Sequence, residues 1–364
     1  MNPAYSPLIS TIIPYYNPRS DFFQEAIESV LSQSYRNWEI IIVNDGSNNE
    51  SRKSLESFIE SINDKRISIL QLDKNYGVSI ARNKGIDFAK GDIITFLDSD
   101  DLHLPWYYNN IINCFSKNPE FLVLHTGNTL YFKIYNFIKG AHYHESHTLS
   151  KEKENNHIYM CFPRLTLKKE CLKKIKFDSN LFCSEDTDLS LQIVNDPVLL
   201  KKSIIMPGPG YLYRFHRSNL RLTNNWDLVL RSMILLFDKY NDKDSPAYKS
   251  LVMYQNMFDN WKFSRELYEY LKTGSISTYL SKTLFSSSSF KDKIKSIRAL
   301  FRIIIVYKFL TPCFAINFSY TNALLNLKYN KCKKLKKIFQ EHLGNLGTED
   351  KSYLYAKKIF QRIF

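Results

Sequence analysis

Three carboxylates stand within four positions at the end of an apolar run, in the stretch "ITFLDSDD". Asp98, Asp100 and Asp101 follow β-branched and apolar residues that predict a buried strand at 92–97. Like charges crowded at the end of a buried strand are unfavourable unless a cation joins them. Hard divalent cations take oxygen ligands and commonly bridge one or two carboxylates to substrate phosphates. Asp98 and Asp100 could therefore share one ion, while a solvated turn whose Asp101 caps a helix near Pro105 stays open.

A second acidic group lies farther along the chain, in "SEDTDLSLQIV" at 184–194. The apolar spacing that follows Glu185 and Asp186 predicts a helix, so both acids stand in its first turn. A positioned carboxylate can remove a proton from a reacting hydroxyl as a general base. Acids in a first turn also complement the helix dipole without any catalytic role. Both interpretations are open from these residues alone.

Strand-like and helix-like segments alternate through the N-terminal part of the chain. This alternation is typical of a parallel sheet covered by helices on both faces. Ligands of open α/β sheets bind beyond the carboxyl ends of the strands, which is where Asn17, Asp45 and Asp98 fall. The sequence therefore predicts that these polar side chains converge on one crevice. The predicted order is strand 9–17, helix 20–35, strand 38–47, helix 51–62, strand 67–72, helix 78–91 and strand 92–97.

The charge distribution predicts a domain boundary. The chain has 364 residues and a net charge of +14, and its length suits two domains. Residues 1–220 contain 25 basic and 25 acidic residues, whereas 221–364 contain 25 basic and 11 acidic residues. The second region has mostly helical patterns, so we predict a helical, basic C-terminal region after residue 220.

The stretch 291–340 alternates basic with apolar residues, a pattern that predicts contact with an anionic membrane surface. A solvated charged face is the open alternative. No zinc-finger spacing or RNA-binding aromatic signature points to nucleic acid. The first residues lack a basic region followed by an apolar core, and the six cysteines form no C-x-x-C pair. We therefore predict a cytoplasmic protein, peripheral on the inner face of the cell membrane.

Five short motifs together carry a resemblance to a known family. The segments "ISTIIPYYN", "VNDGS", "NYGVSIARNKGI", "TFLDSDD" and "SEDTDLSLQI" occur in this order. Their order and spacing resemble the nucleotide-sugar-dependent glycosyltransferases of family 2, which have the GT-A fold. The resemblance covers roughly 8–220 and implies a Rossmann-like, mostly parallel α/β sheet flanked by helices. It also implies a nucleotide-sugar half at about 1–105 and an acceptor half at about 106–220.

The resemblance implies a nucleotide pocket at the first two strands. Asp45 would accept a hydrogen bond from the donor's base, usually uracil. Pro14, Tyr16 and Asn17 would line the pocket, partly through backbone groups. Many relatives carry a second aspartate where this chain has Asn44. This departure removes one charge and leaves the contact predicted for Asp45.

The resemblance also implies a diphosphate and metal site. Arg82, with Lys84 as a second cation, would lie near the diphosphate. Asp98 would contact the ribose or the metal, and Asp100 would bind Mn²⁺ or Mg²⁺ directly. Glu185 and Asp186 match the family's acidic pair, with Asp186 as the catalytic base.

Two further segments contain candidate ligand-binding residues. In "YLYRFHRSNL" at 211–220, the resemblance implies that Arg214 contacts phosphate and that His216 completes the metal shell, although an ordinary strand with exposed basic residues is the alternative. Trp106 and Tyr107 follow the acidic loop and could stack on a sugar or pack in the core.

The sequence thus predicts an inverting, metal-dependent glycosyltransferase. The donor would be a nucleoside-diphosphate sugar, with a UDP-sugar as the expected donor. The acceptor would be a hydroxyl of a glycan or lipid-linked glycan in capsule, lipopolysaccharide or O-antigen synthesis. A polyprenyl-phosphate acceptor and a non-catalytic nucleotide-sugar-binding scaffold are the alternatives. A dinucleotide-dependent oxidoreductase is disfavoured because no G-x-G-x-x-G follows the first strand.

Overall fold

The computed structural model describes residues 6–132, 137–142, 165–181, 183–215, 226–252, 255, 337, 339–348 and 350–363. The chain divides into two compact units. The first contains residues 1–251 together with 332–364, and the second contains residues 252–331. The first unit therefore extends past the boundary predicted at residue 220 and includes the end of the chain. All elements described below belong to this first unit.

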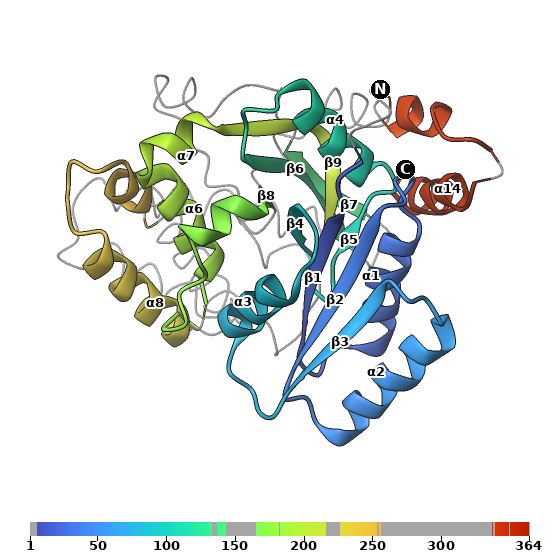
Figure 1. Cartoon of the computed structure of the whole chain (residues 1–364), viewed down its shortest axis with the longest axis horizontal. Coiled ribbons are helices and arrows are strands. Elements are labelled where there is room, and N and C mark those ends of the chain that lie inside the picture. The colour runs from blue at the N-terminus through green and yellow to red at the C-terminus, as the bar shows by residue number, and fades with distance from the viewer. Residues whose placement is uncertain are drawn as a thin grey trace, which may run out of the picture. The chain divides into compact units, whose positions relative to one another are not determined.

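The N-terminal half is a regular alternation of strands and helices (Figure 1). Its four strands are parallel and adjacent in the order β3-β2-β1-β4. The predicted segments are confirmed, with shifts of a few residues at their ends. The elements are β1 (Ile9–Tyr15), α1 (Ser20–Leu31), β2 (Trp38–Asp45), α2 (Asn49–Ile62), β3 (Ile67–Leu72), α3 (Val78–Phe88) and β4 (Ile93–Phe96).

The second half extends the same sheet with mixed pairing. Among the described residues the sheet has nine strands, in the order β3-β2-β1-β4-β8-β6-β9-β5, with β7 paired to β6. β9 runs parallel to β6, whereas β8 is antiparallel to both β4 and β6, and β5 is antiparallel to β9. The strands are β5 (Leu102–His103), β6 (Val123–Phe132), β7 (Phe137–His142), β8 (Leu165–Lys168) and β9 (Ser203–Phe215). The helices are α4 (Tyr107–Lys117), the 3₁₀ turn η1 (Lys169–Lys173), α6 (Glu185–Asn195), α7 (Pro197–Lys201), α8 (Trp226–Lys239) and α14 (Lys351–Ile363).

The central strands are apolar on both faces because each face is covered. Successive residues of a strand point to opposite sides, and Ile40 and Ile42 of β2 face one core while Ile41 and Val43 face the other. The first core also holds side chains of α1 and α4, and the second holds side chains of α3 and α6. This accounts for the continuous apolar runs that predicted buried strands.

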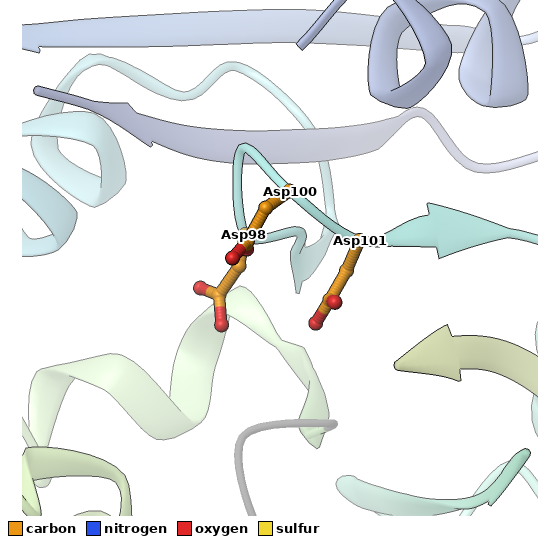
Figure 2. A group of neighbouring side chains, drawn as sticks. All are labelled: Asp98, Asp100 and Asp101. Atoms are coloured by element: carbon orange, nitrogen blue, oxygen red, sulfur yellow. The ribbon is translucent and has the colours of Figure 1, made fainter. Parts of the chain in front are cut away.

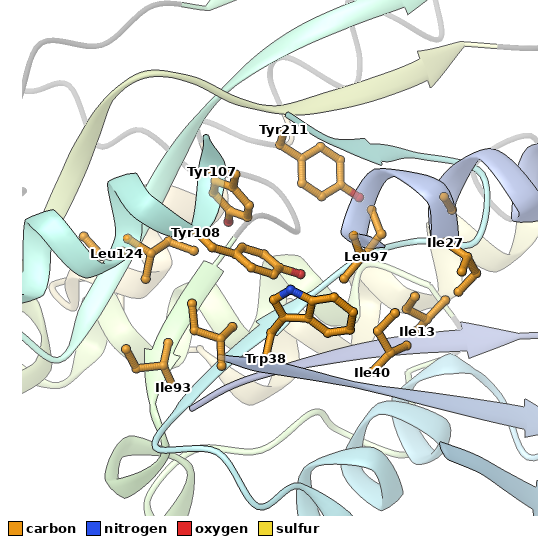
Figure 3. Close-up of a cluster of buried hydrophobic side chains, with 14 of the residues drawn as sticks. Ile13, Ile27, Trp38, Ile40, Ile93, Leu97, Tyr107, Tyr108, Leu124 and Tyr211 are labelled. Atoms are coloured by element: carbon orange, nitrogen blue, oxygen red, sulfur yellow. The ribbon is translucent and has the colours of Figure 1, made fainter. Parts of the chain in front are cut away.

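Aromatic residues after the acidic loop belong to the core. Tyr107 is fully buried and Trp106 is 3% exposed, so the core-packing alternative predicted for them is confirmed. Figure 3 shows Tyr107 and Tyr108 of α4 beside Tyr211 of β9, above the isoleucines of the central strands. These rings share one core with side chains of the central strands.

The C-terminal segment packs against the region that follows the acidic loop. Phe339 is fully buried, and its ring meets the ring of Trp106 edge-on, with 4.8 Å between centroids. Ile359 of α14 joins the same apolar cluster as Leu102 of β5 and Leu212 of β9. None of the described helices is long and apolar enough to cross a membrane. Apart from a few positions near its end, the predicted membrane-contacting stretch lies outside the described residues.

Truncating Phe339 tests this packing. We expect Phe339→Ala to destabilise the first unit by about 3–5 kcal/mol, because it empties a buried aromatic site. Leu354→Ala is the matched control: this α14 side chain is 58% exposed, so its removal should cost less than about 0.5 kcal/mol. Urea unfolding followed by tryptophan fluorescence measures both. Two equally small effects would show that the C-terminal segment does not stabilise the sheet.

Candidate active site

The acidic loop between β4 and β5 is a tight turn. The backbone N–H of Asp101 donates to the carbonyl oxygen of Asp98 at 3.0 Å. One carboxylate oxygen from each of Asp98, Asp100 and Asp101 can be chosen so that all lie within 4.8 Å of one another. Figure 2 shows the three side chains projecting to the same side of the turn. The predicted convergence of Asp98 and Asp100 is therefore present.

Asp101 ties this turn to strand β9. It is only 1% exposed, and its two carboxylate oxygens accept hydrogen bonds from the Tyr211 hydroxyl at 2.8 Å and the Arg214 backbone N–H at 2.7 Å. The alternative in which Asp101 caps a helix near Pro105 does not apply, because α4 begins after Trp106 without a side-chain cap. Asp98 and Asp100 are half-buried, in contrast to Asp101.

Arg82 joins two acidic motifs that are far apart in the sequence. Its guanidinium donates to an oxygen of Asp98 at 2.7 Å and to an oxygen of Glu185. The side chain is 4% exposed. Although burial works against its charge, the nearby carboxylates of Asp98 and Glu185 raise the pKa of Arg82 above its usual value. Arg82 is therefore a fixed cation between the acidic loop and α6.

Close packing of α3 places Arg82 at this point. A Cβ atom added to Gly85 would lie 2.5 Å from the side chain of Ile12 in β1, so only glycine permits this approach. Lys84 of the same helix is exposed and does not share the face of Arg82, since helix positions two apart do not face each other. Its role as a second cation near the diphosphate stays a prediction.

Glu185 and Asp186 begin α6, as predicted. Ser184, just before them, adopts a left-handed conformation with φ of 61°, and an oxygen of Asp186 accepts the Thr187 backbone N–H at 2.6 Å. Burial and the negative charge of Glu185 raise the pKa of Asp186 to about 7, partly offset by Arg82. A carboxyl group tuned to near neutrality suits a general base.

Helix α8 supports α6 through a contact that the sequence did not reveal. Asp188 is fully buried and accepts hydrogen bonds from the Tyr240 hydroxyl at 2.9 Å and the Lys239 ammonium at 3.0 Å. Lys239 also contacts Asp178 at 2.8 Å. The third acid of "SEDTD" thus fixes the helix that presents Asp186. Asp188 itself is visible in the motif. Its partners Lys239 and Tyr240 lie after residue 220, where no motif guided the prediction.

Asp45 anchors the loop that leads into α3. Its oxygens accept the backbone N–H groups of Tyr76 and Gly77, each at 2.8 Å. Burial raises the pKa of Asp45, and these hydrogen bonds oppose that rise. Gly46, with φ of +65°, permits the close approach, since an added Cβ would lie 2.2 Å from the backbone of Lys74. Asp45 therefore contributes to placing Arg82 as well as lying at the predicted nucleotide end.

The loops after β1 and β2 are joined directly. The Asn17 backbone N–H donates to the Ser47 hydroxyl at 3.1 Å, and the Asn17 side chain accepts the Asn48 backbone N–H at 3.0 Å. Tyr16 is 49% exposed, and Pro14 is half-buried at the end of β1. These residues lie at the carboxyl ends of neighbouring parallel strands, where the sequence predicted a crevice.

Arg214, near the end of β9, is part of the described structure. The Arg214 side chain is fully buried and donates to the Asp100 carbonyl oxygen at 2.7 Å and to Glu25 at 2.5 Å. Its guanidinium supports the acidic turn through these protein contacts, and the predicted phosphate contact of Arg214 stays a prediction. His216 lies outside the described residues.

The donor set fits a hard divalent cation. Asp98 and Asp100 offer carboxylate oxygens from a tight turn, and both side chains are less buried than Asp101. One Asp98 oxygen is already held by Arg82, which orients the other. Oxygen ligands of this kind suit Mg²⁺ or Mn²⁺.

Comparison with known proteins finds related sequences. Residues 10–173 match the model of the glycosyl transferase family 2. The chain is 44% identical over 97 residues to TuaG of Bacillus subtilis strain 168, a glycosyltransferase assigned to teichuronic acid biosynthesis. This match covers 27% of the chain and 37% of TuaG, so the chain spans well under half the length of that relative.

A second relative matches a longer stretch of the chain. The chain is 32% identical over 200 residues to WcaA of Escherichia coli K12, a glycosyl transferase assigned to colanic acid biosynthesis, covering 52% of the chain and 67% of WcaA. Among solved structures, residues 1–349 of S. aureus TarS match with a TM-score of 0.45 and 18% identity, over 80% of the chain and 78% of TarS 1–349. On the family model and the WcaA match, the chain belongs to glycosyl transferase family 2.

Proposed function

We propose that the protein is an inverting, metal-dependent glycosyltransferase that uses a nucleoside-diphosphate sugar, with UDP-sugars as the first donors to test. The observation that carries the proposal is the position of Arg82. It contacts both Asp98 of the metal loop and Glu185, the neighbour of Asp186. Three motifs with separate chemical roles thereby meet at one point.

Asp186 is the proposed catalytic base. Inversion requires a group that takes the acceptor hydroxyl proton on the face opposite the leaving diphosphate, and one carboxylate is sufficient. A positioned base contributes about 10²–10⁴-fold to the rate. The raised pKa of Asp186 makes its carboxylate a stronger proton acceptor than an ordinary aspartate, and Glu185, held by Arg82, keeps that pKa high.

Asp98 and Asp100 are the proposed ligands of Mn²⁺ or Mg²⁺. When bound, such an ion stabilises the charge of the departing diphosphate. Arg82 contributes a second, permanent positive charge from the protein itself. Because Arg82 is already oriented by two carboxylates, it needs little reorganisation during the reaction.

The proposed acceptor is a hydroxyl of a glycan or glycolipid in surface polysaccharide synthesis. The names of TuaG and WcaA, which refer to teichuronic acid and colanic acid biosynthesis, support this class of acceptor. A lipid-linked acceptor would suit the basic stretch 291–340, for which contact with the inner face of an anionic membrane stays a prediction. Capsule, lipopolysaccharide and O-antigen glycans are the acceptors to compare.

A donor screen tests the proposal. Full-length protein is incubated with nucleotide sugars and Mn²⁺ or Mg²⁺, and release of nucleoside diphosphate is measured. We expect Asp100→Ala to lower release by about 100-fold or more, since it removes a metal ligand that stabilises the leaving group by several kcal/mol.

Asp87→Ala is the matched control, because Asp87 is an exposed acid on α3, and it should be close to wild type. Donor binding without turnover in any condition would indicate the scaffold alternative. Equal activity of the wild type and Asp100→Ala would overturn the metal assignment.

A further inference from the structure

Strand β9 supports the acidic turn (residues 98–101) through hydrogen bonds. The Asp98 backbone N–H donates to the Tyr211 hydroxyl at 3.3 Å, and the same hydroxyl donates to Asp101 at 2.8 Å. Tyr211 is 1% exposed, and its ring lies in the core beside Tyr107 and Tyr108 of α4 (Figure 3). A single buried hydroxyl thus joins the first and last residues of the turn.

Arg214 holds the same turn at two further points. Its backbone N–H donates to Asp101 at 2.7 Å, and its Nε donates to the carbonyl oxygen of Asp100 at 2.7 Å. The far end of the guanidinium donates to Glu25 of α1 at 2.5 Å and stacks over Phe22, with 4.3 Å from Cζ to the ring centroid. The turn is therefore connected through Arg214 to the helix that follows β1.

A purely stabilising role explains these contacts poorly. Burying an ion pair is often no better for stability than an apolar pair of the same shape. Here, however, the contacts converge on backbone atoms of Asp98 and Asp100 and on Asp101. They hold the turn without using the carboxylates of the two proposed metal ligands, which Figure 2 shows on one side of the turn.

We propose that Tyr211, Arg214 and Glu25 are positioning residues that pre-form the metal site. Three neighbouring carboxylates repel one another, so an unsupported turn would spread before an ion could bind. The connections to β9 and α1 keep Asp98 and Asp100 close enough to share one ion. This inference rests on the proposed metal-dependent function, because it concerns the same two ligands.

The expected consequence is a loss of metal affinity without any change in the ligands. Removing the partners that orient metal ligands typically weakens binding by about 10–100-fold. Tyr211→Phe deletes one hydroxyl and keeps the ring, and Glu25→Gln removes the charge that holds Arg214. We expect each to raise the Mn²⁺ dissociation constant by about tenfold, and Arg214→Lys to raise it further because lysine lacks the planar fork.

Electron paramagnetic resonance of free Mn²⁺ measures binding to the full-length protein, with and without UDP. Tyr108→Phe is the matched control, since it deletes another buried core hydroxyl that contacts Thr11 rather than the acidic turn. Thermal unfolding identifies variants that fail to fold, in which case the milder Tyr211→Phe and Glu25→Gln decide the result.

The possible outcomes distinguish a failure of the positioning role from a failure of the proposed metal-dependent function. Weaker Mn²⁺ binding in Tyr211→Phe and Glu25→Gln, with wild-type affinity in Tyr108→Phe, supports the positioning role. Wild-type affinity in both test variants, while Asp100→Ala abolishes binding, overturns the positioning role and leaves the metal site intact. Absence of any Mn²⁺ binding that depends on Asp100 overturns the metal site and the inference together.

Discussion

Asp186→Asn is expected to lower the rate of sugar transfer by about 10²–10⁴-fold. Asparagine keeps the shape of the side chain but cannot accept the acceptor hydroxyl proton. Binding of the nucleotide sugar should remain close to wild type, because the proposed nucleotide pocket lies at β1, β2 and the loop anchored by Asp45. Initial rates at saturating donor, together with calorimetric donor binding, separate the two effects.

The pH profile gives a second test of the same residue. Burial and the neighbours Glu185 and Asp98 raise the pKa of Asp186 to about 7, against the opposing charge of Arg82. The base works only when it has lost its proton, so wild-type kcat/KM should rise as pH increases through about 7. The residual activity of Asp186→Asn should lack this rise.

Rising pH should lower the stability of the wild-type protein, whereas it raises the activity. The pKa of Asp186 is raised from 3.8 in an unfolded chain to about 7 in the fold, so the unfolded state loses its proton first. Between these two values the wild-type fold becomes progressively less stable relative to Asp186→Asn, and above them the difference is constant. Asp186→Asn should therefore unfold at a higher temperature than wild type at pH 8, with little difference near pH 4.

The exposed Asp87→Asn serves as the control and should change neither property. Undiminished transfer by Asp186→Asn would contradict the role of a base. It would instead favour a polyprenyl-phosphate acceptor, whose ionised oxygen needs no strong base. The same preparation tested with lipid phosphate and with a glycan hydroxyl distinguishes these acceptors.

Arg82→Met is expected to abolish transfer and to destabilise the fold by about 3–5 kcal/mol. The substitution keeps most of the side-chain volume but leaves Asp98 and Glu185 without the cation that both contact. Glu185 has a side chain only 9% exposed, so its uncompensated charge is costly. Urea unfolding measures the stability, and nucleoside-diphosphate release measures the activity.

Two further variants isolate the electrostatic part of this effect. Adding Glu185→Gln to Arg82→Met removes one of the two unpaired charges and should recover part of the stability without recovering activity. Arg52→Met breaks an exposed pair with Glu56 on α2, and such surface pairs contribute less than about 1 kcal/mol. A loss in Arg82→Met no larger than in Arg52→Met would show that Arg82 does not hold the two motifs together.

The sequence predicted the parts of the fold that depend on local pattern. The strands and helices from β1 to β4 follow from apolar periodicity, which the two cores on either side of β2 account for. The positions of Asp45 and Asp98 followed from a general property of parallel sheets, whose strands end at the same edge. The placement of Arg82 relied on the family resemblance.

The parts that escaped prediction depend on contacts between distant segments. Arg82 and Glu185 are 103 residues apart, and Asp101 and Arg214 are 113 residues apart. The strands β8, β6 and β9 also lie in the sheet in an order that differs from their order in the chain, which local sequence patterns do not reveal. The contact between Arg214 and Glu25 of α1, 189 residues apart, was not predicted for the same reason.

The division of the chain has a consequence for how this protein can diversify. The first unit is interrupted after residue 251 and resumes at residue 332. A compact unit whose two ends both join the first unit is a domain insertion, an arrangement that proteins tolerate because the termini of a compact unit usually lie close together at its surface. Evolution can therefore exchange the inserted unit while the sheet and the C-terminal helix of the first unit keep their sequence.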